Sequence, residues 1–477
     1  MNKYLQLIKN ICILGIGSFA SKLVSYALLP LYTSILTTDE YGIAELLSNT
    51  ANLLIPIISL CMSDAVVRFS MENRRNRRDA YSAGITTFLM GYALFLVFWP
   101  VMTKISLIQD YIWLVYLFVL TAALNGFTGL FARCIGYMRL YAYAGFQNTL
   151  LMVGFNLLFL LVFKLGLVGY VLSIILADLL TFLFIFIVGN LKRYLHFTGL
   201  NRALWKIMLR FSIPLIPNTL FWWITNLSDR YLIGYLMADG ESMTGIYGIA
   251  CKIPNFVTLV STIFMQAWQL SAIEEYNNKD KVRFYSQVFT TFQVLVFTTA
   301  SLLMLLVKPI MSVLVASDSF YVAWQYVPFL LLGVSFQCFV NFFSTLYIAA
   351  KRSVANMLTT MVGAVSNIAL NFALIPVWGI QGAAFATFIS FFLVFIVRCV
   401  DCRRTFGVTI QPFRLVLNSV LVLAQTLFTV LQPPYSVAYE SVLFGLILLC
   451  NIRPLLSSAS RLWRILRSRM RAQNQQA

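Results

Sequence analysis

The chain has 477 residues, of which 60% are hydrophobic and 11% are charged, and its 35 Lys and Arg against 17 Asp and Glu give a formal net charge of +18. Soluble domains average about 45 to 50% apolar and 25% charged residues, so this composition excludes a soluble globular protein. Apolar stretches of the roughly 20 residues that a transmembrane helix needs recur along the chain, whereas barrel strands would alternate over about ten residues. We therefore predict an all-α polytopic membrane protein.

The apolar stretches predict about 14 transmembrane helices. Their approximate bounds are 11–36, 43–67, 81–101, 112–132, 143–164, 167–189, 211–236, 245–270, 285–307, 323–349, 355–376, 379–399, 413–432 and 437–452. The first follows Lys3 and Lys9 and is similar to a signal peptide, but it runs for about 25 residues and lacks a small-residue cleavage site. We expect it to be retained as the first transmembrane helix.

The distribution of basic residues predicts the orientation of these helices. One set of alternate connections contains only Lys104, Lys164 and Lys308. Four further cations fall inside predicted helices, namely Lys22, Arg68, Arg230 and Lys252. The other connections and the termini therefore hold 28 of the 35 Lys and Arg residues, and because the side richer in Lys and Arg is cytoplasmic, both termini are predicted to be cytoplasmic. The net charge then reflects orientation and attraction to anionic inner-leaflet lipids rather than nucleic-acid binding.

Two sets of matches indicate an internal repeat. The motif Tyr-Gly-Ile-Ala occurs at 41–44 and again at 247–250, an offset of 206 residues. At an offset of 213, Arg139, Gly166 and Gly169 match Arg352, Gly379 and Gly382. Transporters are often built from two related halves, and six helices return the chain to its starting side. We therefore predict two parallel six-helix lobes, residues 1–190 and 211–400, followed by two further helices in 401–452.

Basic segments connect and follow these parts. Residues 191–210 carry five Lys and Arg residues among aromatic ones, which predicts a basic amphipathic helix in the cytoplasmic interface of the membrane. In the tail, 453–477, Leu and Arg recur at helical spacing. We expect the tail to lie against anionic lipid in the same way.

The sequence contains none of the motifs that we sought for an enzyme or a metal site. The absence of a Gly-x-x-x-x-Gly-Lys loop argues against ATP hydrolysis by this chain. Cys399 and Cys402 have the spacing of a metal or redox pair, but no second pair accompanies them and His196 is the only histidine. We expect a protein that is not an enzyme and has no cofactor or metal. Its energy would come from an H⁺ or Na⁺ gradient, the membrane potential or substrate concentration.

Ionisable residues at membrane depth mark the candidate site, because each costs roughly 2.5 to 3.5 kcal/mol even on a lenient insertion scale. Lys22 lies near the middle of the first predicted helix, and Arg230 and Lys252 lie toward the outer ends of two others. Asp229 is adjacent to Arg230 and is expected to neutralise it. Lys22 and Lys252 then remain uncompensated, so the three cations predict a cavity that binds an anion. The alternative is an Asp229–Arg230 pair that only fixes helix packing.

Three further charged residues lie within predicted helices. Asp64 and Arg68 are four residues apart near the cytoplasmic end of one helix and are predicted to form an ion pair. Asp178 lies near mid-depth without an adjacent base, so it is a candidate for taking up a coupling H⁺ or Na⁺. A hydrogen-bonded structural acid is the alternative for Asp178.

Four short stretches resemble a known transporter family. They are Ser21-Lys22, Pro30-Leu31-Tyr32, Thr-Thr-Asp-Glu-Tyr-Gly at 37–42 and Asn-Leu-Ser-Asp-Arg-Tyr-Leu-Ile-Gly at 226–234. Over nearly its whole length the chain is similar to the polysaccharide-transporter (Wzx-type oligosaccharide) flippases of the multidrug/oligosaccharidyl-lipid/polysaccharide (MOP) exporter superfamily. The resemblance implies two six-helix lobes around a central cavity and alternating access. Two added helices also occur in the related lipid II flippase, whose first helix carries an Arg-Asp pair that this chain lacks.

The resemblance also implies a substrate and a location. The substrate would be an undecaprenyl-diphosphate-linked oligosaccharide for a capsule, O-antigen or similar polymer, flipped from the inner to the outer leaflet of the bacterial cytoplasmic membrane. Lys22, Arg230 and Lys252 would hold its diphosphate. The expected partners are this lipid, anionic inner-leaflet lipids and glycosyltransferases or a polymerase of the same pathway. The alternatives are a flippase of lipid II or a teichoic-acid precursor, a MATE-like drug/cation antiporter, and a membrane scaffold or polymerase.

Overall fold

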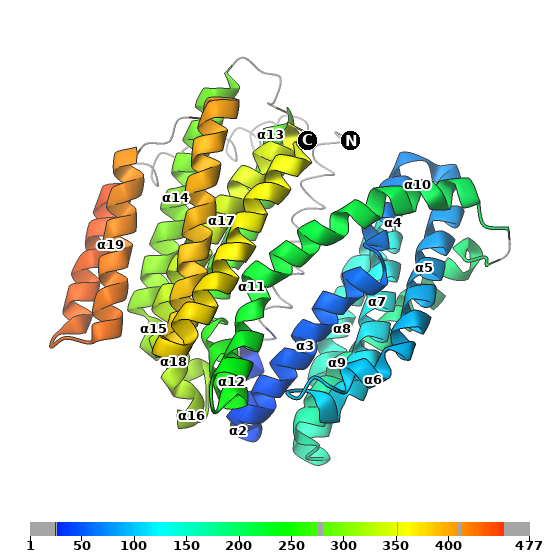
Figure 1. Cartoon of the computed structure of the whole chain (residues 1–477), viewed down its shortest axis with the longest axis horizontal. Coiled ribbons are helices and arrows are strands. Elements are labelled where there is room, and N and C mark those ends of the chain that lie inside the picture. Colours follow the sequence, from blue (N-terminus) through cyan, green and yellow to red (C-terminus); the bar gives the residue numbers. More distant parts are fainter. Residues whose placement is uncertain are drawn as a thin grey trace, which may run out of the picture. The chain divides into compact units, whose positions relative to one another are not determined.

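The computed structural model describes residues 24, 26–197, 199–274, 280–350, 352–408 and 412–452. These residues form helices and no strand, which confirms the predicted all-α class. They divide into two compact units (Figure 1). The first contains the described residues up to Gly248 together with Val313–Tyr321, and the second contains Ile249–Ser312 and the described residues from Val322 onward.

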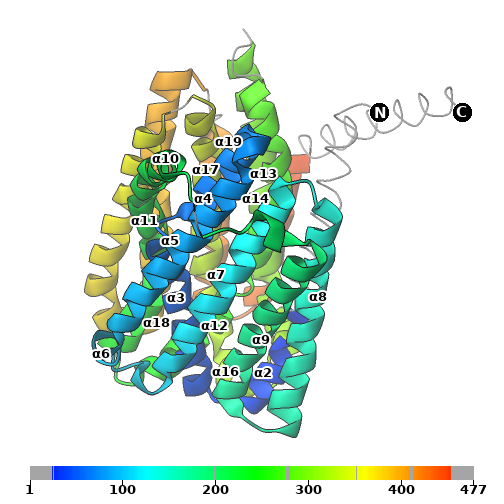
Figure 2. The ribbon, with the colours of Figure 1, turned by 90° about the vertical axis from the view of Figure 1, so that its right-hand side faces the viewer.

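The first unit contains the helices from α2 to α11, most of α12, and α16. Their bounds are α2 Leu29–Ile35, α3 Thr38–Ile58, α4 Met62–Glu72, η1 Arg74–Asn76, α5 Arg77–Val97, α6 Trp99–Met102, η2 Gln109–Tyr111, α7 Ile112–Cys134, α8 Met138–Asn156, η3 Leu157–Val162, α9 Gly166–Val188, η4 Leu191–Tyr194, α10 Arg202–Ser212, η5 Ile213–Leu215, α11 Ile216–Leu236, α12 Gly240–Ala250 and α16 Asp318–Tyr321. α9 packs against both α7 and α8 (Figure 2), and α3 packs against α7, α9 and α11.

The second unit is organised around α17. Its elements are α13 Pro254–Glu274, α14 Lys281–Leu305, most of α15 Val307–Leu314, η7 Val322–Tyr326, α17 Val327–Ala349, α18 Ser353–Phe406, α19 Pro412–Leu431 and a last apolar helix, Ser436–Ile452. α17 packs against α13, α14, α18 and α19. α11 and most of α12 belong to the first unit although the repeat assigns them to the second lobe, so the compact units and the repeats are different divisions. The lobe bounds stay a prediction.

The membrane spans agree with the predicted number. Nine helices of the described residues are long and apolar enough to cross a membrane, or up to eleven if each of two bent pairs is one span. α18 contains two predicted helices, joined at a kink where Gly379 has a φ of 58°, and Ser436–Ile452 corresponds to the last predicted helix. Most of the first predicted helix, 11–36, lies outside the described residues. With α18 counted as two helices and Ser436–Ile452 added, the described residues account for up to 13 of the about 14 predicted helices, and the chain is a multi-pass membrane protein.

One predicted helix, 43–67, is in fact two helices, α3 and α4, at an angle of 53°. α3 begins with a capping box in which Thr37 Oγ1 accepts from the Glu40 N–H and the Glu40 carboxylate accepts from the Thr37 N–H. Pro56, near the end of α3, has no N–H to donate. Leu60 and Cys61 then adopt positive φ values of 51° and 50°, and these left-handed residues turn the chain into α4.

The linker contains the predicted amphipathic helix. α10 continues through η5 into α11 as one bent segment (Figure 1). α10 packs against α4 and α5, with Leu204 and Met208 buried, whereas Arg202, Lys206 and Arg210 are exposed. This part of the linker is thus a helix with buried apolar and exposed basic residues, and its place in the cytoplasmic interface of the membrane stays a prediction.

His196 attaches the start of the linker to α5. Its Nε2 lies 3.0 Å from Asp79 Oδ1, and its Nδ1 lies 2.9 Å from the Oγ of Ser82. The Ser82 hydroxyl also donates to the carbonyl of Tyr194 at 2.9 Å. Ser82 is fully buried, so this arrangement of Asp, His and Ser serves packing.

Arg398 corrects the predicted end of a helix. Arg398 lies just before the end of the predicted helix 379–399, but α18 continues to Phe406, and Arg398 is 1% exposed inside it. Its guanidinium donates hydrogen bonds of 2.5 to 3.2 Å to Val340 O, Ser344 Oγ, Asn356 O, Thr359 Oγ1 and Thr360 Oγ1. These five bonds satisfy the donors of a buried guanidinium and fasten α17 to α18.

Candidate functional site

A buried cluster of charges joins α3 to α11. Arg230 is 8% exposed, and its Nε lies 3.5 Å from Glu45 Oε2. Its Nη1 donates to the carbonyl of Asn226, one turn earlier, at 3.2 Å. The guanidinium also lies 5.7 Å from the ring centroid of Tyr247. A buried cation needs a counter-charge and hydrogen-bond acceptors, and Glu45 and Asn226 supply them.

Tyrosine hydroxyls hold the two carboxylates of this cluster. Tyr247 donates to Asp229 Oδ2 at 2.8 Å, and Tyr41 donates to Glu45 Oε1 at 3.4 Å. Tyr41 and Tyr247 are the first residues of the two copies of Tyr-Gly-Ile-Ala, so each copy supplies one hydroxyl to one acid.

Sequence reasoning missed Glu45. The structure places Glu45 Oε2 3.5 Å from Arg230 Nε, and the expected neutralisation of Arg230 by Asp229 stays a prediction. Glu45 lies inside the predicted helix 43–67, so it gave the same signal as Asp229, an acid at membrane depth. Its pairing with Arg230 joins residues far apart in sequence, which the spacing along a single helix does not reveal.

Glycines bring α3 and α12 into backbone contact beside this cluster. An added Cβ at Gly42 would lie 1.9 Å from the carbonyl oxygen of Glu241, and one at Gly245 would lie 2.1 Å from that of Thr38. The Ser242 hydroxyl donates to Thr38 Oγ1 at 2.7 Å across the same contact. The two copies of the repeated motif therefore lie on helices whose backbones touch.

The described residues do not test whether the three predicted cations come together. Lys22 lies outside them. Arg230 belongs to the first unit, whereas Lys252 lies between α12 and α13 in the second unit. The grouping of Lys22, Arg230 and Lys252 in one anion site stays a prediction.

Asp178 forms a separate polar site on three helices of the first unit. Its Oδ1 accepts from Asn125 Nδ2 of α7 at 2.8 Å and from Asn148 Nδ2 of α8 at 3.0 Å. Asn148 also donates to Thr181 Oγ1 at 3.2 Å. These bonds agree with the structural alternative for Asp178. They also gather carboxylate, amide and hydroxyl oxygens, which are the ligands that hard cations prefer.

The predicted ion pair between Asp64 and Arg68 is wrong. Both residues lie on α4, but no ion pair of the described residues joins them. The guanidinium of Arg68 instead lies 4.4 Å from the ring centroid of Phe211. Arg68 is exposed and makes a cation–π contact, so it is not a neutralised charge at membrane depth.

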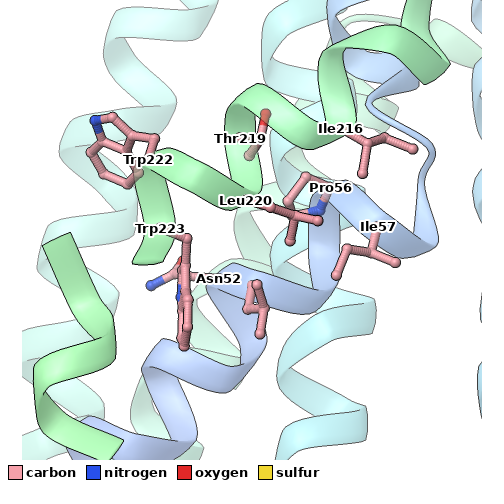
Figure 3. Close-up of a pocket in the computed structure, with 9 residues that line it drawn as sticks. Asn52, Pro56, Ile57, Ile216, Thr219, Leu220, Trp222 and Trp223 are labelled. Atoms are coloured by element: carbon pink, nitrogen blue, oxygen red, sulfur yellow. The ribbon is translucent and has the colours of Figure 1, made fainter. Parts of the chain in front are cut away.

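A small recess lies between α3 and α11 (Figure 3). Its volume is about 50 Å³. It is lined by Asn52, Leu53, Pro56, Ile57, Ile216, Thr219, Leu220, Trp222 and Trp223. Trp223 Nε1 donates to the backbone carbonyl of Asn49 at 3.1 Å, which fixes this indole against α3.

Two family models match the sequence. The model of the polysaccharide biosynthesis protein family matches residues 7–269, which is more than half of the chain. The chain belongs to the polysaccharide biosynthesis protein family. A second model, MatE, matches residues 214–373 of this polysaccharide biosynthesis protein. No curated protein sequence shows a significant match.

Solved structures share the fold of this polysaccharide biosynthesis protein. The lipid II flippase MurJ in an inward closed conformation has a TM-score of 0.70 at 14% identity, over 95% of this chain and 99% of that chain. A multidrug resistance MATE family transporter of the MOP superfamily, inward-facing, has a TM-score of 0.63 at 14% identity, over 80% and 95%. A MOP superfamily transporter from Pyrococcus furiosus has a TM-score of 0.57 at 14% identity, over 82% and 95%. The likeness confirms the predicted MOP-type fold.

This polysaccharide biosynthesis protein therefore has two charged groups with described partners in its first unit. Arg230 lies beside the carboxylate of Glu45, and Asp178 accepts hydrogen bonds from two side-chain amides.

Proposed function

We propose that this protein moves an undecaprenyl-diphosphate-linked oligosaccharide from the inner to the outer leaflet of a bacterial cytoplasmic membrane by alternating access. The observation that carries the proposal is the family match over residues 7–269. A fold that also occurs in a lipid II flippase and in MATE transporters supports it. The role is transport and not catalysis. Lipid II or a teichoic-acid precursor would use the same diphosphate chemistry.

The proposed binding site for the diphosphate consists of Lys22, Arg230 and Lys252. In the described state Arg230 is paired with Glu45, so the diphosphate would replace Glu45 at the guanidinium. Such an exchange is favourable because phosphate oxygens accept paired hydrogen bonds from Arg. A negative-inside potential assists outward movement of an anion by about 2.3 kcal/mol per charge per 100 mV. Asp178 is the proposed site for a coupling H⁺ or Na⁺.

The proposed orientation puts both termini in the cytoplasm. α10 would then lie at the inner leaflet, where its exposed Arg202, Lys206 and Arg210 would contact anionic lipids. Glycosyltransferases or a polymerase of the same pathway are the proposed protein partners, because they make and consume the lipid-linked glycan.

A drug/cation antiporter of the same superfamily is the second candidate. The MatE match over residues 214–373 favours it, and Glu45 and Asp229 provide two acids beside Arg230. An acid-rich site at membrane depth suits a cationic substrate.

Reconstitution into liposomes separates these candidates. The probe is undecaprenyl-diphosphate-linked N-acetylglucosamine with a fluorescent label on the sugar, and a membrane-impermeant reductant bleaches the label in the outer leaflet. We expect the reductant to bleach the whole probe population with the protein and about half of it without. Movement of ethidium driven by an ion gradient, with no movement of the glycolipid, would establish the antiporter. If neither probe moved, the remaining candidates would be a membrane scaffold or a polymerase.

A further inference from the structure

A short segment of the chain is inserted into the first unit. Val313–Tyr321 belongs to this unit, whereas Ser312 before it and Val322 after it belong to the second unit. This inserted segment contains α16. It lies in the connection between the predicted helices 285–307 and 323–349, which the distribution of Lys and Arg predicts to face outward. The inserted segment is therefore joined at both ends to chain of the second unit.

Contacts to α2 and α3 hold the inserted segment in place, with α16 close to α2 (Figures 1 and 2). The N–H of Ala316 donates to Thr33 Oγ1 at 2.9 Å. Thr33 is buried, and its hydroxyl in turn donates to the carbonyl of Leu29 at 3.0 Å. Phe320 is 1% exposed, and its ring meets that of Tyr41 edge to face, with 5.8 Å between the centroids. A paired backbone N–H and a buried ring define one docked position.

Tyr41 connects the inserted segment to the buried charges. Its hydroxyl donates to Glu45 Oε1 at 3.4 Å, and Glu45 Oε2 lies 3.5 Å from Arg230 Nε. Tyr41 is buried, so neighbouring side chains and this hydrogen bond determine where its ring lies. Direct contacts therefore run from Phe320 through Tyr41 and Glu45 to the guanidinium of Arg230.

We infer that the inserted segment is a latch, docked while Glu45 is paired with Arg230 and released when an anion takes the place of Glu45. The inference rests on the proposed function and names how binding at Arg230 would regulate outward opening. A diphosphate on the guanidinium would allow the Glu45 carboxylate to turn away from Tyr41. The Tyr41 hydroxyl would then lose this acceptor, its ring could move, and the contact with Phe320 would weaken.

The connectivity of the chain gives the latch its effect. Because the residues on either side of the inserted segment belong to the second unit, movement of that unit away from α2 and α3 must withdraw the segment. Withdrawal breaks the bond between Ala316 and Thr33 and exposes the ring of Phe320. One hydrogen bond and one aromatic pair each contribute a modest net free energy, so the segment can leave and return. It is therefore an element with two positions, which a physical coupling between two sites requires.

A disulfide that ties the latch shut tests the inference, with Thr33→Cys and Ala316→Cys combined in one chain. The side chain at 33 contacts the backbone at 316, so the two thiols can reach each other. Mass spectrometry of the joined peptides measures the rate of disulfide formation and separates this bond from those of the eight native cysteines. We expect the bond to stop flipping of undecaprenyl-diphosphate-linked N-acetylglucosamine and its reduction to restore flipping. Saturating undecaprenyl diphosphate should slow formation by about threefold, the effect of one lost hydrogen bond.

Tyr41→Phe, added to the double-cysteine chain, tests the path from the anion to the latch. It keeps the ring against Phe320 but removes the hydroxyl, so the disulfide should still form and undecaprenyl diphosphate should no longer slow it. Tyr81→Phe is the matched control, because Tyr81 is equally buried and its hydroxyl pairs with Thr128 of α7 at 3.3 Å. This control should keep the effect of the ligand.

Flipping that continues with the disulfide intact, or a rate of formation that bound undecaprenyl diphosphate does not change, would overturn the inference and leave the proposed function standing. An effect of the ligand that survives in Tyr41→Phe would also overturn it. If the double-cysteine chain does not fold, deuterium uptake by residues 313–321 of the wild type decides instead. Uptake should rise with undecaprenyl diphosphate, and no rise would overturn the inference. Failure of the wild type to bind or flip either lipid would remove the proposed function, and with it the trigger of the latch.

Discussion

Loss of either partner of the Arg230–Glu45 pair should destabilise the protein more than loss of both. At 3.5 Å the attraction between two unit charges is about 5 kcal/mol for an effective dielectric constant of 20. Much of this offsets the cost of burying the charges, so the pair itself contributes little net stability. Removal of one partner leaves the other charge buried, which typically costs about 3 to 5 kcal/mol.

The two single variants should differ. The side chains of Arg230 and Glu45 are 10% and 14% exposed, so solvent reduces these costs only slightly. Glu45→Gln keeps a neutral acceptor beside the guanidinium and should lower the free energy of unfolding by about 2 to 3 kcal/mol. Arg230→Gln leaves the carboxylates of Glu45 and Asp229 together without this cation and should cost about 3 to 5 kcal/mol. The double variant should cost about 2 kcal/mol less than the sum of the singles.

Unfolding in mixed micelles with increasing denaturing detergent, followed by circular dichroism, measures these differences. Glu72→Gln is the control because Glu72 is exposed and forms no ion pair among the described residues. Glu45→Gln should also bind undecaprenyl diphosphate more tightly, since it removes the competing carboxylate. Single variants that each cost less than 1 kcal/mol and add within error in the double variant would refute the view that Arg230 depends on Glu45.

Three further predictions concern topology, coupling and the other cations. Asp239→Cys should react with an impermeant thiol reagent from outside and Asn73→Cys only after permeabilisation; the reverse pattern would discard the predicted orientation. Asp178→Asn should abolish dependence of transport on an ion gradient while leaving substrate binding intact, and transport that stays fully gradient-dependent would exclude Asp178 from coupling. Lys22→Ala and Lys252→Ala should each lower flipping at least tenfold with thermal unfolding nearly unchanged; unstable variants that still transport would make these lysines structural.

The class of fold could be predicted because it follows from composition and from the length of apolar runs. The Lys and Arg distribution constrains the helix count. If one helix were missed, every later connection would be assigned to the opposite side of the membrane and the charge asymmetry would be lost. Helix breaks were harder to predict. The break between α3 and α4 depends on Leu60 and Cys61 in the left-handed region, and neither residue type signals such a conformation. The continuation of α18 beyond residue 399 was hard to predict because the five acceptors of Arg398 lie on two helices and make burial of its guanidinium tolerable.

The site could be predicted only in part. Arg230 and Asp229 were recognisable from their cost in a membrane, and both are buried. Their partners Glu45 and Tyr247 lie on other helices, and helical periodicity carries no information about which helices meet.

The two ends of α3 are held differently. At one end the helix meets α12 through glycines, where backbone meets backbone. At the other end Pro56, Leu60 and Cys61 break the helix. A single methyl group at Gly42 cannot fit 1.9 Å from the carbonyl oxygen of Glu241. Gly42→Ala would therefore push α3 and α12 apart at the place where the two copies of the repeated motif meet.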